Sequence, residues 1–390
     1  MTRTAVTVIA APDMDSDPAP MKICVVVARF SLTGVPLTQI RFARALAARG
    51  HDVDLVFGHV GADTLPTHIG TAKLVVLGPS TARGMLLPFC RYLRRTKPDI
   101  VFSSQDNLNG FVLLAAILTR SQAQISGSSR VNPFFTYSNR PLTRKWVFKQ
   151  AMRAVMWRAD ALTCVSDGMV EEYRALFRQP PHVTVYNLVD DAPSRLRIRE
   201  PVDHPWFVDK TCPIVVSAGT LSSRKGFADL IAAFARLIAD GRDLRLVIFG
   251  EGASRADLER QVRDLGLEAR VSLPGQIANP LRYFARADVF AMTSYFEGLG
   301  NVLIEAMMCG CSLVSTDCPS GPAEILGFGQ FGSVVPVGDV AALAEAIAGQ
   351  IDHPTDPAVL AEGVRRFGED AVIDRHFALL GLTGRERVVA

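Results

Sequence analysis

The sequence predicts an α/β protein built from two doubly wound, Rossmann-like domains that face each other across a central cleft. The 390 residues are enough for two domains. Short apolar runs alternate with helix-length segments over residues 22–190, and the alternation restarts at residue 213. Strands that are apolar on both faces are typical of parallel sheets covered by helices on both sides.

The first alternation predicts an N-terminal domain over residues 22–190. The apolar run 23–28 predicts its first strand, and apolar residues at helical spacing over 40–49 predict a helix that ends at Gly50. Further strands are expected at 53–57, 74–77, 100–102, 124–125, 161–165 and 183–186. The predicted C-terminal helix 369–385 is a candidate to complete this domain.

The second alternation predicts a C-terminal domain over residues 213–366. A stretch rich in Pro, Asp and Arg, residues 191–212, predicts the linker before it. In doubly wound domains, ligands bind at the carboxyl ends of the strands, so the site is expected at that edge. Residues 1–20 predict a disordered tail.

Composition excludes several classes of protein. The chain is 48% hydrophobic and 21% charged, which is typical of globular domains. No run approaches the ~20 apolar residues of a membrane-spanning helix, and the apolar run 5–11 is a poor signal peptide. Seven cysteines scattered through apolar runs predict core residues rather than a metal site. We therefore expect a cytoplasmic protein.

The net charge of +3 conceals an asymmetry between the two halves. Residues 22–190 carry 21 basic and 10 acidic side chains, whereas residues 191–390 carry 20 basic and 26 acidic ones. The basic half indicates an anionic partner. The lack of an aromatic RNA-binding motif argues against nucleic acid.

Segment 141–158 is a candidate for the surface of this chain that contacts the anionic partner. It places Lys145, Lys149 and Arg153 four residues apart, beside several aromatic residues. This pattern predicts either an amphipathic helix on the anionic inner face of a membrane or a packed helix with a solvated basic edge.

The segment 217–226 has the pattern of a phosphate-binding loop. It follows a predicted buried strand and precedes a helix, where backbone N–H groups favour anions. Gly219 and Gly226 permit tight turns. Arg224 can fork onto two phosphate oxygens while Lys225 supplies a point charge. Taken alone, a solvated loop explains the segment equally well.

Two glutamates flank the start of a later helix. Glu297 lies in the loop after the predicted strand, and Gly298 and Gly300 allow the backbone to approach a ligand. Asn301 is the expected N-cap, and Glu305 lies about one turn into the helix, where it could accept both hydroxyls of a ribose. The alternative is that both glutamates only stabilise the first turn.

Two more strand-end turns complete the predicted edge. Gly250 and Gly252 form half of a dinucleotide fingerprint that lacks its third glycine. Pro274 and Gly275 could present backbone groups to a nucleobase.

Together these motifs resemble the retaining glycosyltransferases of family 4, which have the two-domain GT-B fold. The family signature is a glutamate, seven residues and a second glutamate, and Glu297 and Glu305 reproduce it. The loop Arg224-Lys225-Gly226 resembles the family too. The resemblance is dense over 213–340 and thinner over 22–190.

The resemblance implies roles for these residues. Arg224 and Lys225 would neutralise the leaving diphosphate, helped by backbone N–H groups near Asn301 and Val302. Glu305 would bind the ribose and Glu297 the donor hexose, while Pro274 and Gly275 would line the base. The resemblance implies no divalent metal and no other cofactor, and no Asp-x-Asp motif follows a predicted strand.

The N-terminal half departs from the family pattern. Gly34 stands alone where relatives have a glycine pair, and residues 103–109 replace a segment in which relatives often have a histidine. We expect Gly34, Asp106, Asn109 and Arg130 on the acceptor side, with turn and cap roles as the alternative.

The predicted function is transfer of a hexose or N-acetylhexosamine, from a UDP-sugar, to a cell-surface glycan or lipid-linked acceptor. Two alternatives remain at this point. One is a UDP-sugar epimerase of the same fold, and the other is a non-catalytic protein that binds sugar nucleotides.

Overall fold

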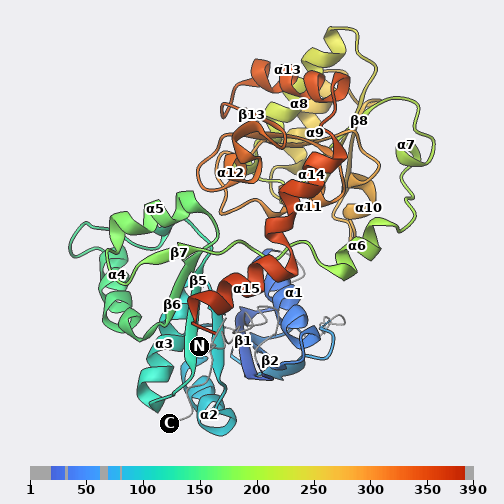
Figure 1. Cartoon of the computed structure of the whole chain (residues 1–390). Helices are drawn as coiled ribbons and strands as arrows, with labels where there is room; N and C mark the ends of the chain where they lie inside the picture. Colours follow the sequence, from blue (N-terminus) through green and yellow to red (C-terminus); the bar gives the residue numbers. More distant parts are fainter. Residues whose placement is uncertain (1–18, 31–33, 62–68, 80, 383–390) are drawn as a thin grey trace, which may run out of the picture.

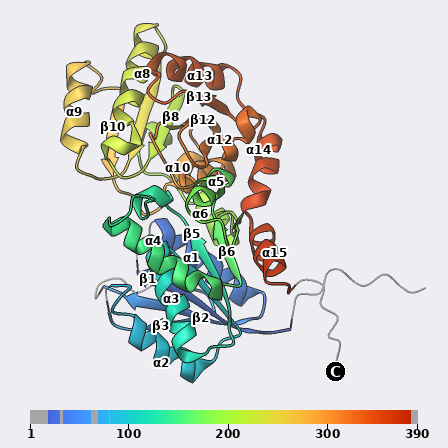
Figure 2. The same cartoon turned by 90° about the vertical axis from the view of Figure 1, so that its left-hand side faces the viewer.

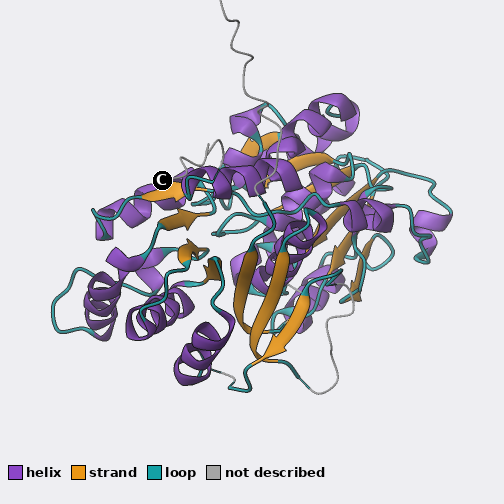
Figure 3. Cartoon of the chain, turned by 60° about the horizontal axis from the view of Figure 1, so that its bottom comes forward, coloured by secondary structure: helices purple, strands orange, loops and turns teal. Residues whose placement is uncertain are grey.

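A computed structural model describes residues 19–30, 34–61, 69–79 and 81–382. The described chain forms two α/β domains that meet along one side of each (Figure 1). In both, helices flank a sheet of parallel strands (Figure 3). The predicted fold class is therefore confirmed. The predicted tail, residues 1–20, lies almost wholly outside the described residues.

The N-terminal sheet has seven parallel strands in the order β3-β2-β1-β4-β5-β6-β7. Its strands are β1 (Lys22–Arg29), β2 (Asp52–His59), β3 (Lys73–Val76), β4 (Ile100–Ser104), β5 (Gln124–Ser129), β6 (Ala161–Cys164) and β7 (His182–Thr184). Its helices are α1 (Gly34–Ala48), α2 (Leu86–Thr96), α3 (Asp106–Thr119), α4 (Arg144–Val155) and α5 (Asp167–Leu176).

The C-terminal sheet has six parallel strands in the order β10-β9-β8-β11-β12-β13. They are β8 (Ile214–Ala218), β9 (Arg245–Phe249), β10 (Val271–Gly275), β11 (Val289–Met292), β12 (Ser312–Thr316) and β13 (Ser333–Val335). The helices are α8 (Phe227–Ala239), α9 (Arg255–Asp264), α10 (Leu281–Phe284), α11 (Asn301–Met308), α12 (Pro322–Ile325), α13 (Val340–Asp352) and α14 (Pro357–Val364).

The chain crosses between the domains twice. After the C-terminal domain it returns, and α15 (Glu369–Leu379) lies across the N-terminal domain (Figures 1 and 2). Val372, Ile373 and Phe377 of α15 are buried in the same apolar cluster as β1 and α1. Asp190 and Gly368 form a β-bridge, so the two crossing segments run side by side.

The segment predicted to be the linker, residues 191–212, contains two short helices, α6 (Ala192–Ile198) and α7 (Pro205–Val208). Asp191 caps α6 by accepting a hydrogen bond from the backbone N–H of Ser194 at 2.8 Å. Asp followed by Ala-Pro is a helix-start pattern, which accounts for the first of these helices.

Helix α4 also differs from the expected basic stripe. Lys149 is buried and donates to the side chain of Asn139, and Lys145 donates to the carbonyl of Phe134 at 2.8 Å. The long aliphatic stem of Lys149 lets a lysine enter the protein while its ammonium group keeps a polar partner. Lys145 and Arg153 of the expected stripe are exposed, beside exposed apolar side chains in and around the helix, namely Leu142, Val147, Phe148 and Trp157.

Candidate active site

Lys225 and Glu297 form an ion pair at the carboxyl edge of the second sheet. The Lys225 Nζ atom lies 2.5 Å from Oε1 of Glu297, which also accepts a hydrogen bond from Ser294 Oγ at 2.7 Å. Arg224 reaches the other carboxylate oxygen at 3.4 Å and donates to the carbonyl of Phe296 at 3.0 Å. The structure thus gathers the three predicted catalytic residues Arg224, Lys225 and Glu297.

Burial alone would raise the pKa of Glu297, because it disfavours the charged form. The charge and hydrogen bond of Lys225, with the contributions of Ser294 and Arg224, outweigh it, so the pKa of Glu297 is lowered. Glu297 is therefore an anion at neutral pH and cannot act as a proton donor there.

The backbone fixes the two loops against each other. Thr293 Oγ1 donates a hydrogen bond to the backbone carbonyl of Lys225 at 2.9 Å. The backbone N–H of Tyr295 donates to the backbone carbonyl of Arg224 at 2.8 Å. Gly226 has a φ of +64°, and a Cβ atom there would lie 1.9 Å from the carbonyl oxygen of Thr293. Only glycine fits this contact, so the close approach of the loops depends on Gly226.

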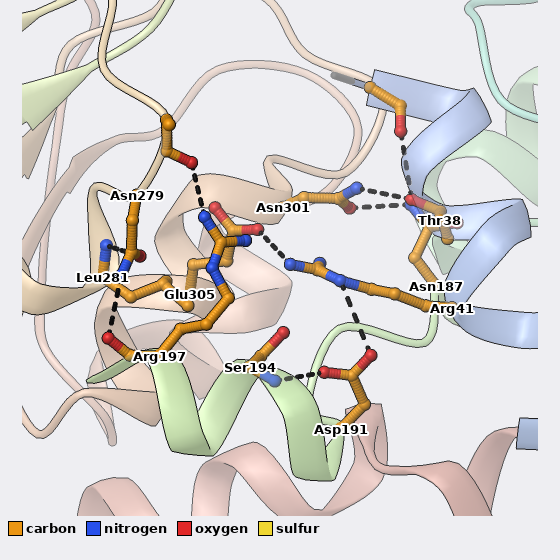
Figure 4. Close-up of polar contacts among 12 residues, drawn as sticks. Thr38, Arg41, Asn187, Asp191, Ser194, Arg197, Asn279, Leu281, Asn301 and Glu305 are labelled. Carbon is orange, nitrogen blue, oxygen red and sulfur yellow. Dashed lines mark hydrogen bonds and ion pairs between the residues drawn. The ribbon is translucent and has the colours of Figure 1, made fainter. Parts of the chain in front are cut away.

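Helix α11 begins beside this cluster, but one residue earlier than expected. Gly300 is the N-cap, with a φ of +95°, and Asn301 is the first helical residue, so the predicted capping role of Asn301 is wrong. The Asn301 side chain instead donates to Thr38 Oγ1 at 3.1 Å and accepts from Asn187 at 2.7 Å, both in the N-terminal domain (Figure 4). Val302 follows as the second helical residue.

Glu305 lies on the side of α11 that faces the N-terminal domain. Its Oε1 atom is 2.9 Å from Nη2 of Arg41 on α1 (Figure 4). The two side chains are 15% and 4% exposed. A carboxylate one turn into α11 therefore sits between the domains, close to the helix start.

The remaining predicted turns lie at the ends of neighbouring strands. Gly219 follows β8, and its N–H donates to the backbone carbonyl of Phe249 at 2.9 Å. Gly250 follows β9, and its N–H donates to the backbone carbonyl of Gly275 at 2.8 Å. Gly252 packs on the backbone of Leu221. Pro274, next to Gly275, is exposed at the end of β10. All of these turns lie along the carboxyl edge of the second sheet.

On the N-terminal side, Gly34 opens α1, and its carbonyl accepts from Thr38 Oγ1 at 3.3 Å. Arg130 follows β5 and donates from Nη1 to the side chain of Asn187, the partner of Asn301. Burial lowers the pKa of Arg130 to about 9. Its Nε atom has no hydrogen-bond partner among the described residues. Arg130 therefore lies at the junction of the two domains.

Asp106 and Asn109 do not line this junction as an exposed acceptor surface. Asp106 is 7% exposed and accepts from Ser129 Oγ at 2.9 Å and from Tyr173 at 2.7 Å. Asn109 is fully buried, between Ser103 and the carbonyl of Ser128. The prediction of an acceptor role for these two residues is corrected: they hold β4, β5 and α3 together through buried hydrogen bonds.

Several junction residues carry no motif and were missed. Arg41, Thr38 and Asn187 contact α11 from the N-terminal domain. Phe135 packs on Phe296 with ring centroids 5.4 Å apart. One signal for Arg41 was available: it interrupts the apolar helix face on which its neighbours are buried.

The described residues contain no group of three or more His, Cys, Asp or Glu side chains that could hold a metal ion. The seven cysteines, all of which lie within the described ranges, are free. Within the same ranges, none of the helices combines the length and the hydrophobicity needed to span a bilayer.

Two facing doubly wound domains with the loops of both at the junction define a GT-B protein. HepE of Anabaena, solved in complex with UDP, superposes with a TM-score of 0.74 at 19% identity, over 93% of this chain and all of that one. The model of the glycosyl transferases group 1 matches residues 199–367, and that of the glycosyl transferase 4-like domain matches residues 33–187. The chain therefore belongs to the GT-B glycosyltransferase family that these two models describe.

Curated relatives match parts of the chain. A Campylobacter jejuni N-acetylgalactosaminyltransferase, which acts on a diphospho-undecaprenol-linked sugar according to its name, is 44% identical over 123 residues, 32% of this chain and 33% of that protein. The lipopolysaccharide core glycosyltransferase LpsE of Rhizobium meliloti is 30% identical over 230 residues, 57% of this chain and 64% of LpsE. The chain thus covers less than two thirds of the length of either relative.

Proposed function

We propose that this protein is a retaining glycosyltransferase that moves a hexose or N-acetylhexosamine from a UDP-sugar to a cell-surface glycan or lipid-linked acceptor. The observation that carries the proposal is the cluster of Arg224, Lys225 and Glu297 beside the start of α11. It combines fixed cations, for a leaving diphosphate, with an anionic carboxylate for sugar hydroxyls.

The reaction needs positive charge where the diphosphate develops its charge. In the donor, the bond from the anomeric carbon to the phosphate oxygen breaks, and the acceptor oxygen bonds to that carbon on the same face. The acceptor proton passes to the departing phosphate oxygen. Preorganised cations such as Arg224 and Lys225, with the N–H groups of Asn301 and Val302, stabilise this step without rearrangement.

Two relatives supply the analogy for the proposed substrates. The HepE structure contains UDP, and the Campylobacter relative is named for a lipid diphosphate acceptor. We extend both to this chain, with Glu305 on the ribose and Pro274 and Gly275 beside the base. The basic N-terminal half suits an anionic, lipid-linked acceptor.

We further propose that segment 141–158 touches the inner face of an anionic membrane. Leu142 is 91% exposed, Val147 56% and Trp157 66%. The basic side chains beside them, Arg144 and Arg153, are also exposed. Apolar side chains flanked by arginines suit the boundary between head groups and acyl chains.

A direct test combines ligand binding with product analysis. Thermal unfolding is measured with a panel of nucleotide sugars, because a ligand of the folded state raises the melting temperature. We expect a rise with UDP-sugars alone, and a new glycoside when a lipid extract is added. A free, altered sugar nucleotide would identify an epimerase, and binding without turnover would contradict the transferase proposal.

A further inference from the structure

Three buried polar atoms line one cavity in the N-terminal domain. They are Nε of Arg130, Nδ1 of His376 and Oγ of Ser126, and none of them has a hydrogen-bond partner among the described residues. Ser126 is 1% exposed and His376 is 7% exposed. Buried polar groups are nearly always hydrogen-bonded, so three such atoms around one cavity indicate a place for a polar ligand.

The sequence of β5 creates the space. Side chains alternate between the two faces of a strand, which puts Ser126 and Ser128 on one face and Ser129, which bonds to Asp106, on the other. Serine is much smaller than the valine or isoleucine usual in a buried parallel strand, so a cavity remains under α1 and α15. The cavity admits the centre of one water-sized atom, about 10 Å³. One oxygen of a phosphate or carboxylate has that size.

The charge of Arg130 favours an anion over a water molecule. Within the described residues, its guanidinium bonds to the neutral amide of Asn187, and no carboxylate offsets the burial that lowers its pKa. A guanidinium only donates hydrogen bonds, and a buried cation without an anion is costly. His376 packs between Phe42 and Phe102, and its neutral ring can carry a hydrogen on Nδ1 and donate as well.

The cavity lies beside the junction of the two domains. Thr38, which also lines it, accepts a hydrogen bond from Asn301 at the start of α11 (Figure 4). The backbone carbonyl of Arg130 lies against Gly298, the residue that follows Glu297. A group bound here would therefore be close to the loop of the proposed sugar-binding carboxylate, on the N-terminal side of the junction.

We propose that Arg130, Ser126 and His376 bind one oxygen of an anionic group on the acceptor, a phosphate or a carboxylate. This inference rests on the proposed function, because it takes the junction as the place where the acceptor meets the donor. The rest of the anionic group stays outside the cavity, since only one oxygen fits. The acceptor is then a molecule that carries an oxyanion close to the hydroxyl that receives the sugar.

The test measures the binding of inorganic phosphate to protein saturated with UDP, which fills the proposed diphosphate site. The phosphate affinity is obtained at constant ionic strength from the rise in melting temperature. We expect Ser126→Ala to weaken phosphate binding about fivefold, from loss of one hydrogen bond, and Arg130→Met at least tenfold, from loss of a charged donor.

Ser104→Ala is the matched control for Ser126→Ala. Ser104 lies on the neighbouring strand β4, is also 1% exposed, has no partner for its hydroxyl among the described residues, and does not line the cavity. This variant should bind phosphate as the wild type does. Ser126→Ala removes a single oxygen atom, so it keeps the inference testable if Arg130→Met does not fold.

Acetate in place of phosphate separates the two sources of the anion. Tighter binding of phosphate assigns the cavity to a phosphate group, such as that of a lipid diphosphate. Tighter binding of acetate assigns it to the carboxylate of an acidic sugar. In either case, Ser126→Ala must weaken the anion that binds more tightly.

Failure of this inference can be told apart from failure of the proposed function. Equal phosphate affinity in wild type, Ser126→Ala and Ser104→Ala would mean that the cavity holds only water, and would overturn the inference. A tenfold loss of UDP affinity in Arg130→Met would assign Arg130 to the donor and overturn it too. If UDP does not raise the melting temperature, the proposed function fails, while phosphate titration without UDP still tests the oxyanion site.

Discussion

The carbonyl oxygen of Arg130 occupies the place where a side chain at residue 298 would stand. A Cβ atom on Gly298 would lie 2.5 Å from that oxygen. Gly298 follows Glu297, and Arg130 follows β5 of the other domain. The loop that carries Glu297 and the N-terminal domain are therefore in contact through backbone atoms, with no side chain between them. This contact explains a glycine next to the proposed sugar-binding carboxylate more specifically than general loop flexibility does.

Gly298→Ala is expected to lower kcat/KM at least tenfold, because the methyl group must push apart the loops that hold Glu297 and Arg130. Both domains should still fold, since the clash lies at their junction. Steady-state kinetics with thermal unfolding as a folding check measures this. Gly349→Ala, in the exposed part of α13 with open space around it, is the matched control and should be tolerated. Normal kinetics in Gly298→Ala would show that the two loops separate during turnover.

Lys225→Ala is expected to reduce kcat by about a hundredfold or more, because it removes a fixed cation from the proposed diphosphate site. It also leaves the buried Glu297 with less positive charge around it. Lys210→Ala provides the control, because Lys210 is likewise paired with a carboxylate, that of Asp288, at 2.7 Å but away from this cluster. Equal turnover in the two variants would remove the site assignment.

Much of the C-terminal site could be predicted because its residues sit in one local pattern of strand, loop and helix. Arg224, Lys225 and Glu297 lie in the loops that follow β8 and β11, and Glu305 lies about one turn into the helix that follows the second loop. Parallel strands bring these loops to one edge of the sheet. Their local surroundings were less predictable. Asn301 resembles an N-cap in sequence, but the partners that its side chain finds, Thr38 and Asn187, are remote in sequence.

The N-terminal side shows the limit of the same reasoning. Asp106 and Asn109 have the residue types of a binding loop, and only the packing of Ser129, Tyr173 and Ser103 around them reveals that they are buried. Arg41 was missed because it belongs to no motif in the sequence and its partner, Glu305, belongs to the other domain. Contacts between domains follow from their relative placement, which periodicity and local motifs do not encode.

Removal of divalent metal is expected to leave the transfer rate unchanged within about twofold, because Arg224 and Lys225 supply the charge that a metal would otherwise provide. Initial rates are measured after dialysis against EDTA, with and without added Mg²⁺ or Mn²⁺. Strong inhibition by EDTA that Mg²⁺ or Mn²⁺ reverses would contradict the metal-free mechanism.

His376 is expected to make the fold sensitive to mild acid. Burial, with a smaller effect from the charge of Arg130, lowers the pKa of His376 to about 3. Between that value and the ordinary pKa of about 6.5, the unfolded chain binds a proton that the folded chain does not. Stability therefore falls as the pH drops below 6.5, by up to about 1.4 kcal/mol per pH unit from this group.

His376→Phe should lower the slope of unfolding free energy against pH by the share that one bound proton contributes. Phenylalanine is chosen because the His376 ring packs between Phe42 and Phe102, where a phenyl group fits. Urea unfolding at pH 7 and pH 5.5 measures the change. His376 is not the only contributor, because burial also lowers the pKa of His182, to about 4. His353→Gln, an exposed control, should retain the wild-type slope. A variant His376→Phe with the full slope would assign the acid sensitivity elsewhere.

Trp157→Glu is expected to weaken binding to anionic vesicles at least fivefold, because a charged side chain cannot enter the apolar boundary and repels the acidic lipid head groups. Co-sedimentation with phosphatidylglycerol vesicles, compared with phosphatidylcholine alone, measures this. Leu265→Glu is the control, because Leu265 is a similarly exposed apolar residue, 45% exposed, at the end of α9 in the other domain. If the two variants sediment alike, α4 is a packed helix with a solvated edge and the acceptor reaches the site by another surface. If only Trp157→Glu is lost from the vesicles, the exposed apolar side chains of segment 141–158 form the membrane contact.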